Sequence, residues 1–194
     1  IADFKEAREE GAIILDTRHE IEFVIGHIPN SLFIGLHGNF AMWVGALITD
    51  LNQKILLVTE EGKEKEAVMR LARVGYDHSV GFLQGGFETW RHSGEKVATI
   101  ASISPKEFEK KYKEGIEIID VRKPGEFEAQ HVKDATSLPL DYIHEHLDDL
   151  DRDKTYYVHC LGGYRSVSAV SILQPYGYPN LINVEGGFNA FKNS

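Results

Sequence analysis

Cysteine is the scarcest reactive residue in the sequence, because Cys160 is the only one among 194 residues. A single thiol cannot form an internal disulfide or supply the ligands of a zinc cluster. Hydrophobic runs are also short, and none reaches the roughly 18 residues that a membrane-spanning helix needs. The N-terminal segment IADFKEAREEG is charged, unlike a secretory signal peptide. We therefore expect a cytoplasmic protein that makes no contact with membranes.

Positive charge is in deficit as well. Lys and Arg together number 21 against 30 Asp and Glu, which gives a formal net charge of -9. An acidic chain of this kind repels nucleic-acid phosphates and anionic lipids, so neither is an expected partner. The hydrophobic fraction of 42% and the charged fraction of 26% are typical of globular proteins and exclude a disordered chain.

Several short motifs occur twice in the chain, in the same order. The pairs are Asp16-Thr17-Arg18 with Asp120-Val121-Arg122, His27-Ile28 with His131-Val132, Gly75-Tyr76 with Gly177-Tyr178, and Gly85-Gly86-Phe87 with Gly186-Gly187-Phe188. The spacing is 104 residues for the first two pairs, 102 for the third and 101 for the fourth, as small loop changes between two copies would give. We therefore predict two domains, residues 1–95 and 104–194, joined by a linker at 96–103.

Within each copy, short apolar strands alternate with helices. Strands are predicted at Ile13–Leu15, Lys54–Val58, Glu117–Ile119, Thr155–His159 and Leu181–Val184, and helices at Lys63–Arg73 and Arg165–Leu173. This alternation predicts an α/β fold in which a mostly parallel central sheet carries helices on both faces. Ser104, followed by Pro105 and Glu107, is expected to cap a helix. Asp3 is expected to cap the first helix of the chain.

Cys160 lies where an open parallel sheet binds its ligands, between a strand that ends at His159 and a helix that opens near Arg165. Gly162 and Gly163 let the intervening backbone turn its amide hydrogens inward, and the helix N-terminus adds partial positive charge. Arg165 can add a full positive charge. These features favour an accessible thiolate nucleophile over a small, buried and inert residue.

The segments HCLGGYRS, IDVRKPGEFEAQHVKDA and VEGGFNAF together resemble the rhodanese homology domain, a family of sulfurtransferases. The resemblance covers essentially all of the second copy, and the first copy is similar to the same family. It implies two rhodanese-like domains of the α/β class. One departure is Gln130, where the family usually has glycine before the histidine at position 131, and we expect it to perturb a turn.

The resemblance implies sulfur transfer between small sulfur-containing substrates in two steps. The Cys160 thiolate attacks the sulfane sulfur of thiosulfate or of a low-molecular-weight persulfide, and sulfite, cyanide or a thiol then removes that sulfur from the Cys160 persulfide. Cys160 and Arg165 are then catalytic, and the expected substrate-binding residues are Leu161, Gly162, Gly163, Tyr164 and Ser166. Arg165 either attracts an anionic donor or ties the loop down through a carboxylate or carbonyl group. No metal and no cofactor are expected in this chain.

Other polar residues near this loop are expected to be structural. Asp120, Arg122 and His131 recur in the first copy, and we expect them to support the fold. His159 precedes Cys160 on a strand, so its side chain is expected on the opposite face, with a minor role at most. Glu126 is expected to cap or pair locally. The acidic residues at positions 148, 149, 151 and 153 are expected to form a solvated loop.

The first copy has no cysteine for this chemistry. Aligning Val58 with Val158 places Glu60 at the position of Cys160, and a carboxylate cannot accept sulfane sulfur. We therefore expect the first copy to be an inactive, pseudo-rhodanese domain. An additional segment at residues 38–50 either exposes Trp43 or buries it.

Two other functions remain open on the sequence alone. Phosphatases and arsenate reductases also place an arginine after a cysteine, but phosphatase loops have five residues between them, whereas four lie between Cys160 and Arg165. A non-catalytic persulfide carrier or docking module is the other alternative. The arrangement further resembles the C-terminal part of bacterial fusions that begin with a metallo-β-lactamase-fold persulfide dioxygenase, which implies a role in sulfide detoxification. Iron is expected only in such an N-terminal domain.

Overall fold

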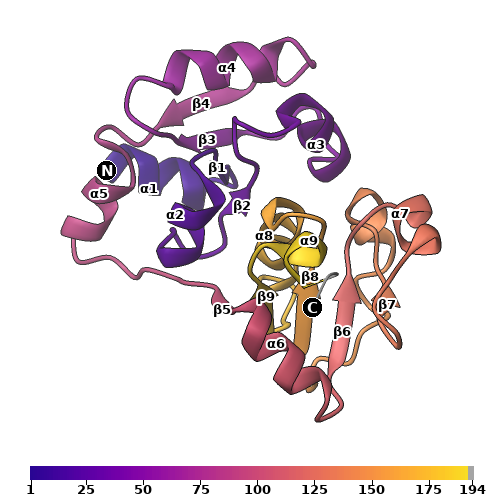
Figure 1. Cartoon of the computed structure of the whole chain (residues 1–194). Coiled ribbons are helices and arrows are strands. Elements are labelled where there is room, and N and C mark those ends of the chain that lie inside the picture. The colour runs from indigo at the N-terminus through magenta and orange to yellow at the C-terminus, as the bar shows by residue number, and fades with distance from the viewer. Residues whose placement is uncertain (192–194) are drawn as a thin grey trace. The chain divides into compact units, whose positions relative to one another are not determined.

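The computed structural model describes residues 1–191 and divides the chain into two compact units, Ile1–Thr99 and Ile100–Ser194 (Figure 1). Each unit holds one copy of the repeat and has a sheet of its own. The repeat seen in the sequence therefore corresponds to two separately folded α/β domains.

The first domain is built on a four-stranded parallel sheet in the order β2-β1-β3-β4. The strands are β1 (Ile13–Asp16), β2 (Leu32–Phe33), β3 (Ile55–Val58) and β4 (Ser79–Phe82), and the helices are α1 (Ala2–Glu9), α2 (Glu20–Ile25), α3 (Phe40–Leu47), α4 (Glu64–Ala72) and α5 (Gly86–His92). Helices α1 and α5 meet where the rings of Phe4 and Trp90 pack edge to face, and α3 packs against α4. Every residue of β3 is buried, as expected for a central strand that is covered on both faces.

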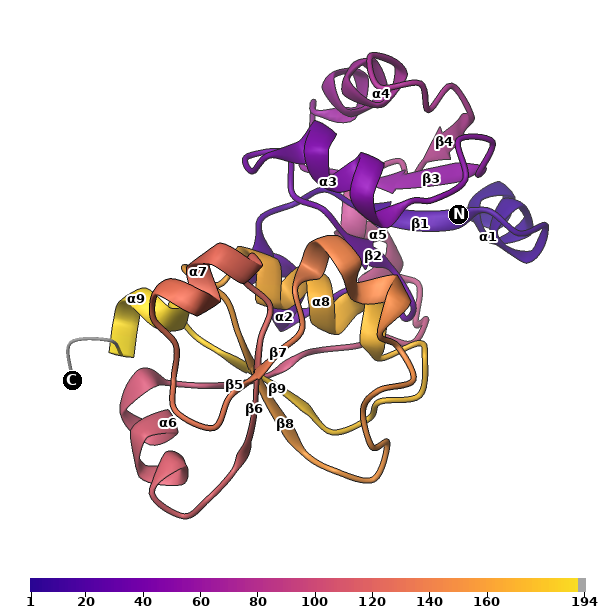
Figure 2. The same cartoon turned by 90° about the vertical axis from the view of Figure 1, so that its right-hand side faces the viewer.

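The second domain has a five-stranded parallel sheet in the order β5-β9-β8-β6-β7. The strands are β5 (Ala101–Ile103), β6 (Glu117–Asp120), β7 (Thr136–Ser137), β8 (Tyr156–His159) and β9 (Leu181–Val184). The helices are α6 (Pro105–Tyr112), α7 (Pro124–Ala129), the 3-10 helix η1 (Leu140–Glu145), α8 (Tyr164–Leu173) and α9 (Gly187–Phe191). Helices α6 and α9 pack together on one side of the sheet, and α8 and η1 on the other (Figure 2).

The predicted strands and helices are all present, so the α/β class is confirmed. The predicted cap at Ser104 is confirmed too, because its side chain accepts from the Glu107 backbone amide and Glu107 accepts from the Ser104 amide. The predicted cap at Asp3 is wrong. Helix α1 begins at Ala2, with Ile1 at the cap position and no side-chain cap, so Asp3 lies inside the first turn. An acidic residue in the first turn is still favourable, because the positive end of the helix dipole lies there.

Residues 96–103, expected to be a linker, contain backbone pairing at both ends. Ala98 forms an antiparallel bridge with His27 in the first domain, and Ala101–Ile103 forms β5, which pairs with β9 in the second. The additional segment at residues 38–50 contains α3, and Trp43 is buried there. It therefore contributes to the core of the first domain.

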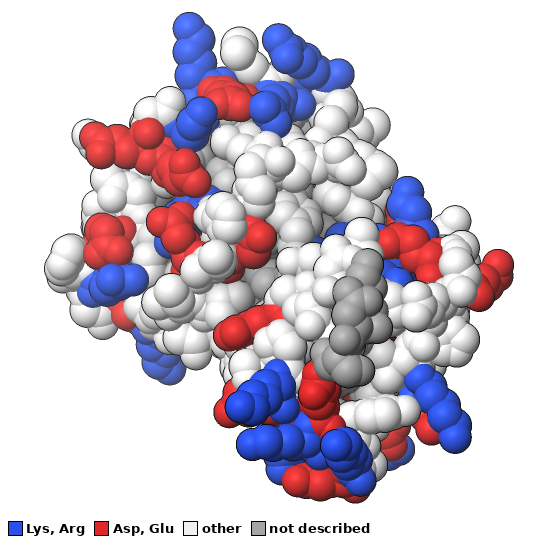
Figure 3. All heavy atoms as spheres, viewed as in Figure 1, with Lys and Arg blue, Asp and Glu red and all other residues white. Residues whose placement is uncertain are grey.

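The visible surface carries both signs of charge in small groups, and basic side chains gather with acidic neighbours around α6 (Figure 3). Lys110 and Lys111 lie in the last turn of that helix, where the negative end of the dipole favours cations. None of the helices within residues 1–191 is long and apolar enough to cross a membrane.

His27 couples the stability of the first domain to pH. Its imidazole is buried, stacks on Phe23 with 3.9 Å between ring centroids, and places Nδ1 2.8 Å from the Phe23 carbonyl oxygen. Burial lowers the pKa of His27 to about 4 from its ordinary 6.5. The unfolded chain therefore binds a proton between these pH values that the folded domain does not bind.

Stability of the first domain should consequently fall as the pH is lowered from 6.5 towards 4, by roughly 1.4 kcal/mol per pH unit from this group. Trp43 and Trp90 are the only two tryptophans and both are buried in the first domain, so tryptophan emission during urea unfolding of the full chain reports this domain. We expect His27→Gln to flatten the dependence of unfolding free energy on pH, and His131→Gln in the second domain to leave it unchanged. Equal slopes for wild type and His27→Gln would contradict the assignment.

Candidate active site

Cys160 lies at the carboxyl end of β8 and immediately before the turn that leads into α8. The Gly163 backbone amide donates to Cys160 Sγ over 3.1 Å, and Ser166 Oγ lies 3.7 Å from the same sulfur. Gly163 has a φ of 109°, a left-handed conformation that favours glycine. This turn is what aims an amide hydrogen at the sulfur.

The Cys160 side chain is less accessible than the sequence suggested, because the residue is only 1% exposed. The expectation of an accessible sulfur is therefore wrong for this conformation. Leu161 and Gly162, the next two residues, are exposed and form the outer part of the loop.

Helix α9 holds the other side of the loop. The Phe188 amide donates to the Cys160 carbonyl oxygen over 2.7 Å, and the Asn189 amide donates to the Leu161 carbonyl oxygen over 3.0 Å. Gly187 makes this close approach possible: a Cβ there would collide with the Cys160 carbonyl oxygen and lie 2.9 Å from the Leu161 carbonyl carbon. The second glycine of the repeated Gly-Gly-Phe motif therefore positions the cysteine loop.

Gly187→Ala should displace the loop, because both colliding atoms belong to the backbone and Gly187 has a positive φ of 55°. A displacement of about 1 Å at a reacting group costs on the order of 10²-fold in rate, and we expect a loss of that size in any reaction at Cys160. Gly125→Ala is the matched control, since nothing lies within 4 Å of its added Cβ. Equal rates for the two variants would show that the approach of Gly187 does not position the loop.

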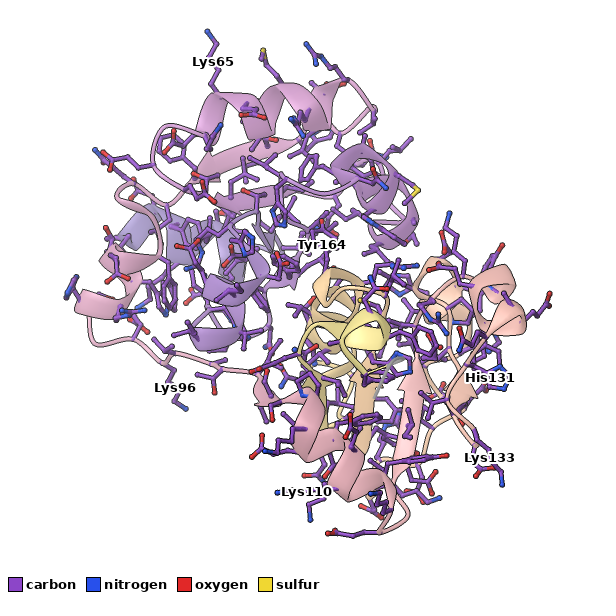
Figure 4. The ribbon with its side chains drawn as sticks, in the orientation of Figure 1. Lys65, Lys96, Lys110, His131, Lys133 and Tyr164 are labelled. Atoms are coloured by element: carbon purple, nitrogen blue, oxygen red, sulfur yellow. The ribbon has the colours of Figure 1, made fainter. Side chains whose placement is uncertain are left out.

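Ser166 anchors the first turn of α8 beneath the sulfur. Its hydroxyl contacts the Gly163 carbonyl oxygen at 2.8 Å and Asn183 Oδ1 at 2.7 Å, so it links the loop to β9. Tyr164 is the first residue of α8 and lies at the end of that helix (Figure 4). Of the predicted binding residues, Gly163 and Ser166 contact the sulfur of Cys160. Leu161 and Gly162 lie in the loop between Cys160 and Gly163, and Tyr164 begins α8.

Arg165 is held by a carboxylate. Its two terminal nitrogens lie 2.6 and 2.9 Å from the two oxygens of Glu126, a bidentate ion pair between α8 and α7. The hydrogen bonds from Arg165 lower the pKa of Glu126. The structure thus contains the contact with a carboxylate that one of the two roles of Arg165 requires, with Glu126 as the partner. Attraction of an anionic donor by Arg165 stays a prediction. Both side chains remain partly exposed, at 15% and 30%.

Asp120 and Arg122 form a buried ion pair at the end of β6, the strand that pairs with β8 next to Cys160. Arg122 Nη2 lies 2.6 Å from Asp120 Oδ2 and donates to the Gln130 carbonyl oxygen over 2.7 Å. Arg18 makes the same contacts with Asp16 and with the Gly26 carbonyl oxygen in the first domain.

The expected perturbation at Gln130 is absent. Its φ of -166° is extended, like the -173° of Gly26. Because any residue adopts this conformation, the turn does not need glycine.

The two histidines near the site differ in their surroundings. His159 is fully buried, its Nδ1 contacts the Cys160 carbonyl oxygen at 3.3 Å, and Nε2 lies 3.7 Å from Asp120 Oδ2. Burial lowers the pKa of His159, which favours the neutral imidazole. His131 stacks on Phe127 and lies at the outer edge of the domain (Figure 4). Neither imidazole hydrogen-bonds to the sulfur in the contacts of residues 1–191.

The comparison with known proteins decides the family. The model of the rhodanese-like domain matches residues 1–93 and again residues 104–194. The chain belongs to the rhodanese family.

Two relatives and one solved structure illustrate the similarity. An uncharacterized protein of Synechocystis sp. is 32% identical over 97 residues, 50% of this chain and 54% of that protein. The thiosulfate sulfurtransferase GlpE of Pseudomonas syringae is 30% identical over 92 residues, 47% of this chain and 87% of that protein. A rhodanese-like domain protein from Staphylococcus aureus is 33% identical, with 47% of this chain and 91% of that chain covered and a TM-score of 0.45. The chain thus spans about half the length of the Synechocystis relative, and its relatives include a sulfurtransferase.

The first rhodanese domain carries Thr59, not Glu60, at the position of Cys160. Asp16 pairs with Val58 in the first sheet, as Asp120 pairs with His159 in the second. The next residue is Thr59 in one domain and Cys160 in the other, so the expected match of Glu60 with Cys160 is wrong by one position. Apolar strands look alike when shifted by one residue, whereas backbone pairing fixes which residue follows the strand.

The turn around Thr59 forms an acidic cavity of about 680 Å³. Its lining includes Arg18 and five glutamates, at positions 22, 60, 61, 64 and 88. Glu22 corresponds to Glu126 by the spacing of 104, and Glu64 corresponds to Arg165 by the spacing of 101. The ion pair that ties the loop in the second rhodanese domain is therefore replaced by two acidic residues in the first.

Proposed function

We propose that the second rhodanese domain is a sulfurtransferase that carries sulfane sulfur on Cys160. The Cys160 thiolate attacks the outer sulfur of thiosulfate or of a low-molecular-weight persulfide, the donor's S–S bond breaks, and the sulfite or thiolate leaves with the bonding electron pair. A thiophilic acceptor such as cyanide, sulfite or a thiol then attacks the terminal sulfur of the Cys160 persulfide. That step restores the thiolate, so the kinetics should be ping-pong.

The observation that carries the proposal is the turn around Cys160. The Gly163 amide already donates to the sulfur at 3.1 Å, and preorganised amide donors stabilise developing negative charge in a site shielded from water. The sulfur is buried, so the loop has to open before a donor reaches it. Leu161 and Gly162 are the exposed residues of the loop, and displacing Leu161 breaks the hydrogen bond from the Asn189 amide to its carbonyl oxygen.

The ion pair between Arg165 and Glu126 favours sulfur transfer over phosphate chemistry. A phosphate cradle needs an arginine whose forked donors face the phosphate oxygens, and both terminal nitrogens of Arg165 face the Glu126 carboxylate instead. The loop of four residues between Cys160 and Arg165 is also shorter than a phosphatase loop. We therefore place phosphatase and arsenate reductase activity behind sulfur transfer.

The first rhodanese domain is proposed to be inactive in this reaction. Thr59 supplies a hydroxyl in place of the thiol, and a hydroxyl forms no persulfide. The five glutamates around the neighbouring cavity repel an anionic donor such as thiosulfate. Both the lack of a thiol at Thr59 and the negative charge of the cavity therefore favour an inactive first domain.

The assignment is tested by offering purified protein thiosulfate with cyanide, and separately p-nitrophenyl phosphate. We expect thiocyanate to form with parallel double-reciprocal plots, and no release of nitrophenol. Nitrophenol release that depends on Cys160 would support a phosphatase instead. A stable persulfide that no acceptor discharges would support a carrier module.

We further propose that the physiological reaction combines sulfite with persulfide sulfur to form thiosulfate, in sulfide detoxification. The proposal rests on the resemblance to persulfide dioxygenase fusions, in which an iron-containing domain would supply the sulfite. Purified protein given sulfite and glutathione persulfide should form thiosulfate. Absence of thiosulfate, with thiocyanate still formed from thiosulfate and cyanide, would remove this role and leave the transferase.

A further inference from the structure

Three potential metal ligands lie close together in the first domain. Their positions in the sequence precede the turn at Thr59. His19, Glu20 and His37 each offer one ligand atom, and these atoms lie within 4.8 Å of one another. Glu20 Oε2 lies 3.2 Å from His19 Nδ1 and 2.8 Å from His37 Nε2. Among residues 1–191 no other group of three such side chains comes together in this way.

The backbone fixes the three residues in place. His19 is the cap residue of α2, Glu20 is the first residue of that helix, and His37 follows β2. The Leu36 amide donates to the Thr17 carbonyl oxygen over 3.0 Å, which joins the two segments beside the ligands. Gly35 leaves room for the ring, since a Cβ there would lie 2.8 Å from His37 Cε1 and 2.9 Å from the Arg18 carbonyl oxygen.

The charge at the centre of this group is not balanced by hydrogen bonds. Glu20 Oε2 is buried and accepts no hydrogen bond of good geometry from the described residues, although two imidazole nitrogens lie within 3.2 Å of it. A buried carboxylate oxygen needs a cation or donors close by. An ion between the three ligand atoms meets that need directly.

We propose that His19, Glu20 and His37 bind one divalent transition-metal ion of the zinc class. Imidazole and carboxylate suit Zn²⁺, whose ligand atoms stand roughly 3.3 Å apart in a tetrahedral site. The two contacts of Glu20 Oε2 are close to that spacing. The rings of His19 and His37 are stacked, with 4.5 Å between centroids and 6° between planes, so binding turns one ring until both nitrogens face the ion. Both side chains are more than 40% exposed, which leaves room for the rotation. His19 Nδ1 accepts from the Ile21 amide over 3.4 Å, and the metal replaces this long hydrogen bond.

Three protein ligands leave at least one position open on the metal. His19 and His37 also line a cavity of about 250 Å³, whose other charged residues are Glu60, Lys63, Glu66 and Arg70. Lys63 and Arg70 are both paired with Glu66, at 2.9 and 2.7 Å. Glu60 adds a second negative charge to the lining, so these four charges balance. The open position therefore faces a polar cavity that holds water or a small ligand.

The second domain provides an internal comparison. At the spacing of 104, Lys123, Pro124 and Asp141 stand where the first domain has His19, Glu20 and His37. The rhodanese-like fold therefore does not require the three ligands. Their presence in the first domain alone points to a role that the second domain does not share, and the proposal is independent of sulfur transfer at Cys160.

The test is isothermal titration calorimetry of the full chain with Zn²⁺, in a Cys160→Ser background that removes the only thiol. We expect one ion per chain, and at least about a tenfold loss of affinity in Glu20→Gln and in His37→Gln. His92→Gln, at an exposed histidine of the same domain, is the matched control and should bind like the parent. Tryptophan emission of each variant shows that the first domain is folded.

A second measurement locates the ion. Co²⁺ should shift and broaden the NMR signals of the His19 and His37 rings and leave those of His131 in the second domain unchanged. No binding to the parent would overturn the proposal, as would equal losses in His92→Gln and His37→Gln, which would show adventitious binding to surface histidines. Binding in which Co²⁺ leaves the His19 and His37 signals unchanged would overturn it too.

Discussion

Cys160→Ser should abolish sulfur transfer while leaving the fold intact. The substitution replaces one atom by a smaller one, and Gly163 can still donate to it, but the serine hydroxyl does not form a persulfide. Removal of a single essential nucleophile costs enzymes about a thousandfold or more in rate, and we expect a loss of at least that size. Thiocyanate formation from thiosulfate and cyanide measures it.

The matched control for Cys160→Ser is Thr59→Ser in the first domain. Thr59 occupies the same position relative to its sheet as Cys160, as the pairing of Asp16 with Val58 and of Asp120 with His159 shows. We expect Thr59→Ser to leave the transfer rate unchanged. Transfer by Cys160→Ser at a rate within about tenfold of wild type would show that the sulfur is carried elsewhere, and a loss in Thr59→Ser would assign the first domain a part in the reaction.

Asp120→Ala should strongly destabilise the second domain. Asp120 is fully buried and accepts from Arg122 through Nε, Nη2 and the backbone amide, at 2.6 to 3.0 Å. Its loss leaves the Arg122 guanidinium buried, with the Gln130 carbonyl as its remaining hydrogen-bond acceptor among the described contacts. Breaking a buried pair in this way costs about 3–5 kcal/mol. Urea unfolding followed by circular dichroism measures the change.

The first domain supplies the control, because Asp16→Ala breaks the equivalent pair there. We expect tryptophan emission, which reports only the first domain, to lose stability in Asp16→Ala and to be unchanged in Asp120→Ala. Transferase activity reports the second domain. In urea it should therefore be lost at a lower concentration in Asp120→Ala than in wild type, and at the wild-type concentration in Asp16→Ala. If Asp120→Ala lowers the free energy of unfolding by less than about 1 kcal/mol, the buried pair stabilises the domain no more than an exposed ion pair does.

The repeat made much of the fold predictable from the sequence. Motifs that recur in order identify two domains, and the alternation of apolar strands with helices identifies a parallel sheet. The short edge strands β2 and β7, each of two residues, carried too little pattern to be predicted. The three residues of β5 were predicted to belong to the linker. They are recognised as a strand only from their pairing with β9, which the sequence does not show.

The site was predictable where it is local in sequence. The turn from Cys160 to Ser166 is continuous, so its glycines and its position before a helix identify it directly. The pair between Arg165 and Glu126 joins residues 39 positions apart, and the sequence left two roles for Arg165 open. The burial of Cys160 depends on how the turn folds over the sulfur, and the position of Thr59 depends on strand register. Both are properties of the folded backbone.

Mass spectrometry of the intact protein after exposure to thiosulfate tests the central claim most directly. If the covered sulfur of Cys160 can be reached and sulfurated, the wild-type chain gains one sulfur atom, the gain maps to the peptide that contains Cys160, and cyanide removes it. Cys160→Ser should gain none. A wild-type chain that stays unmodified with thiosulfate and with glutathione persulfide would contradict the account.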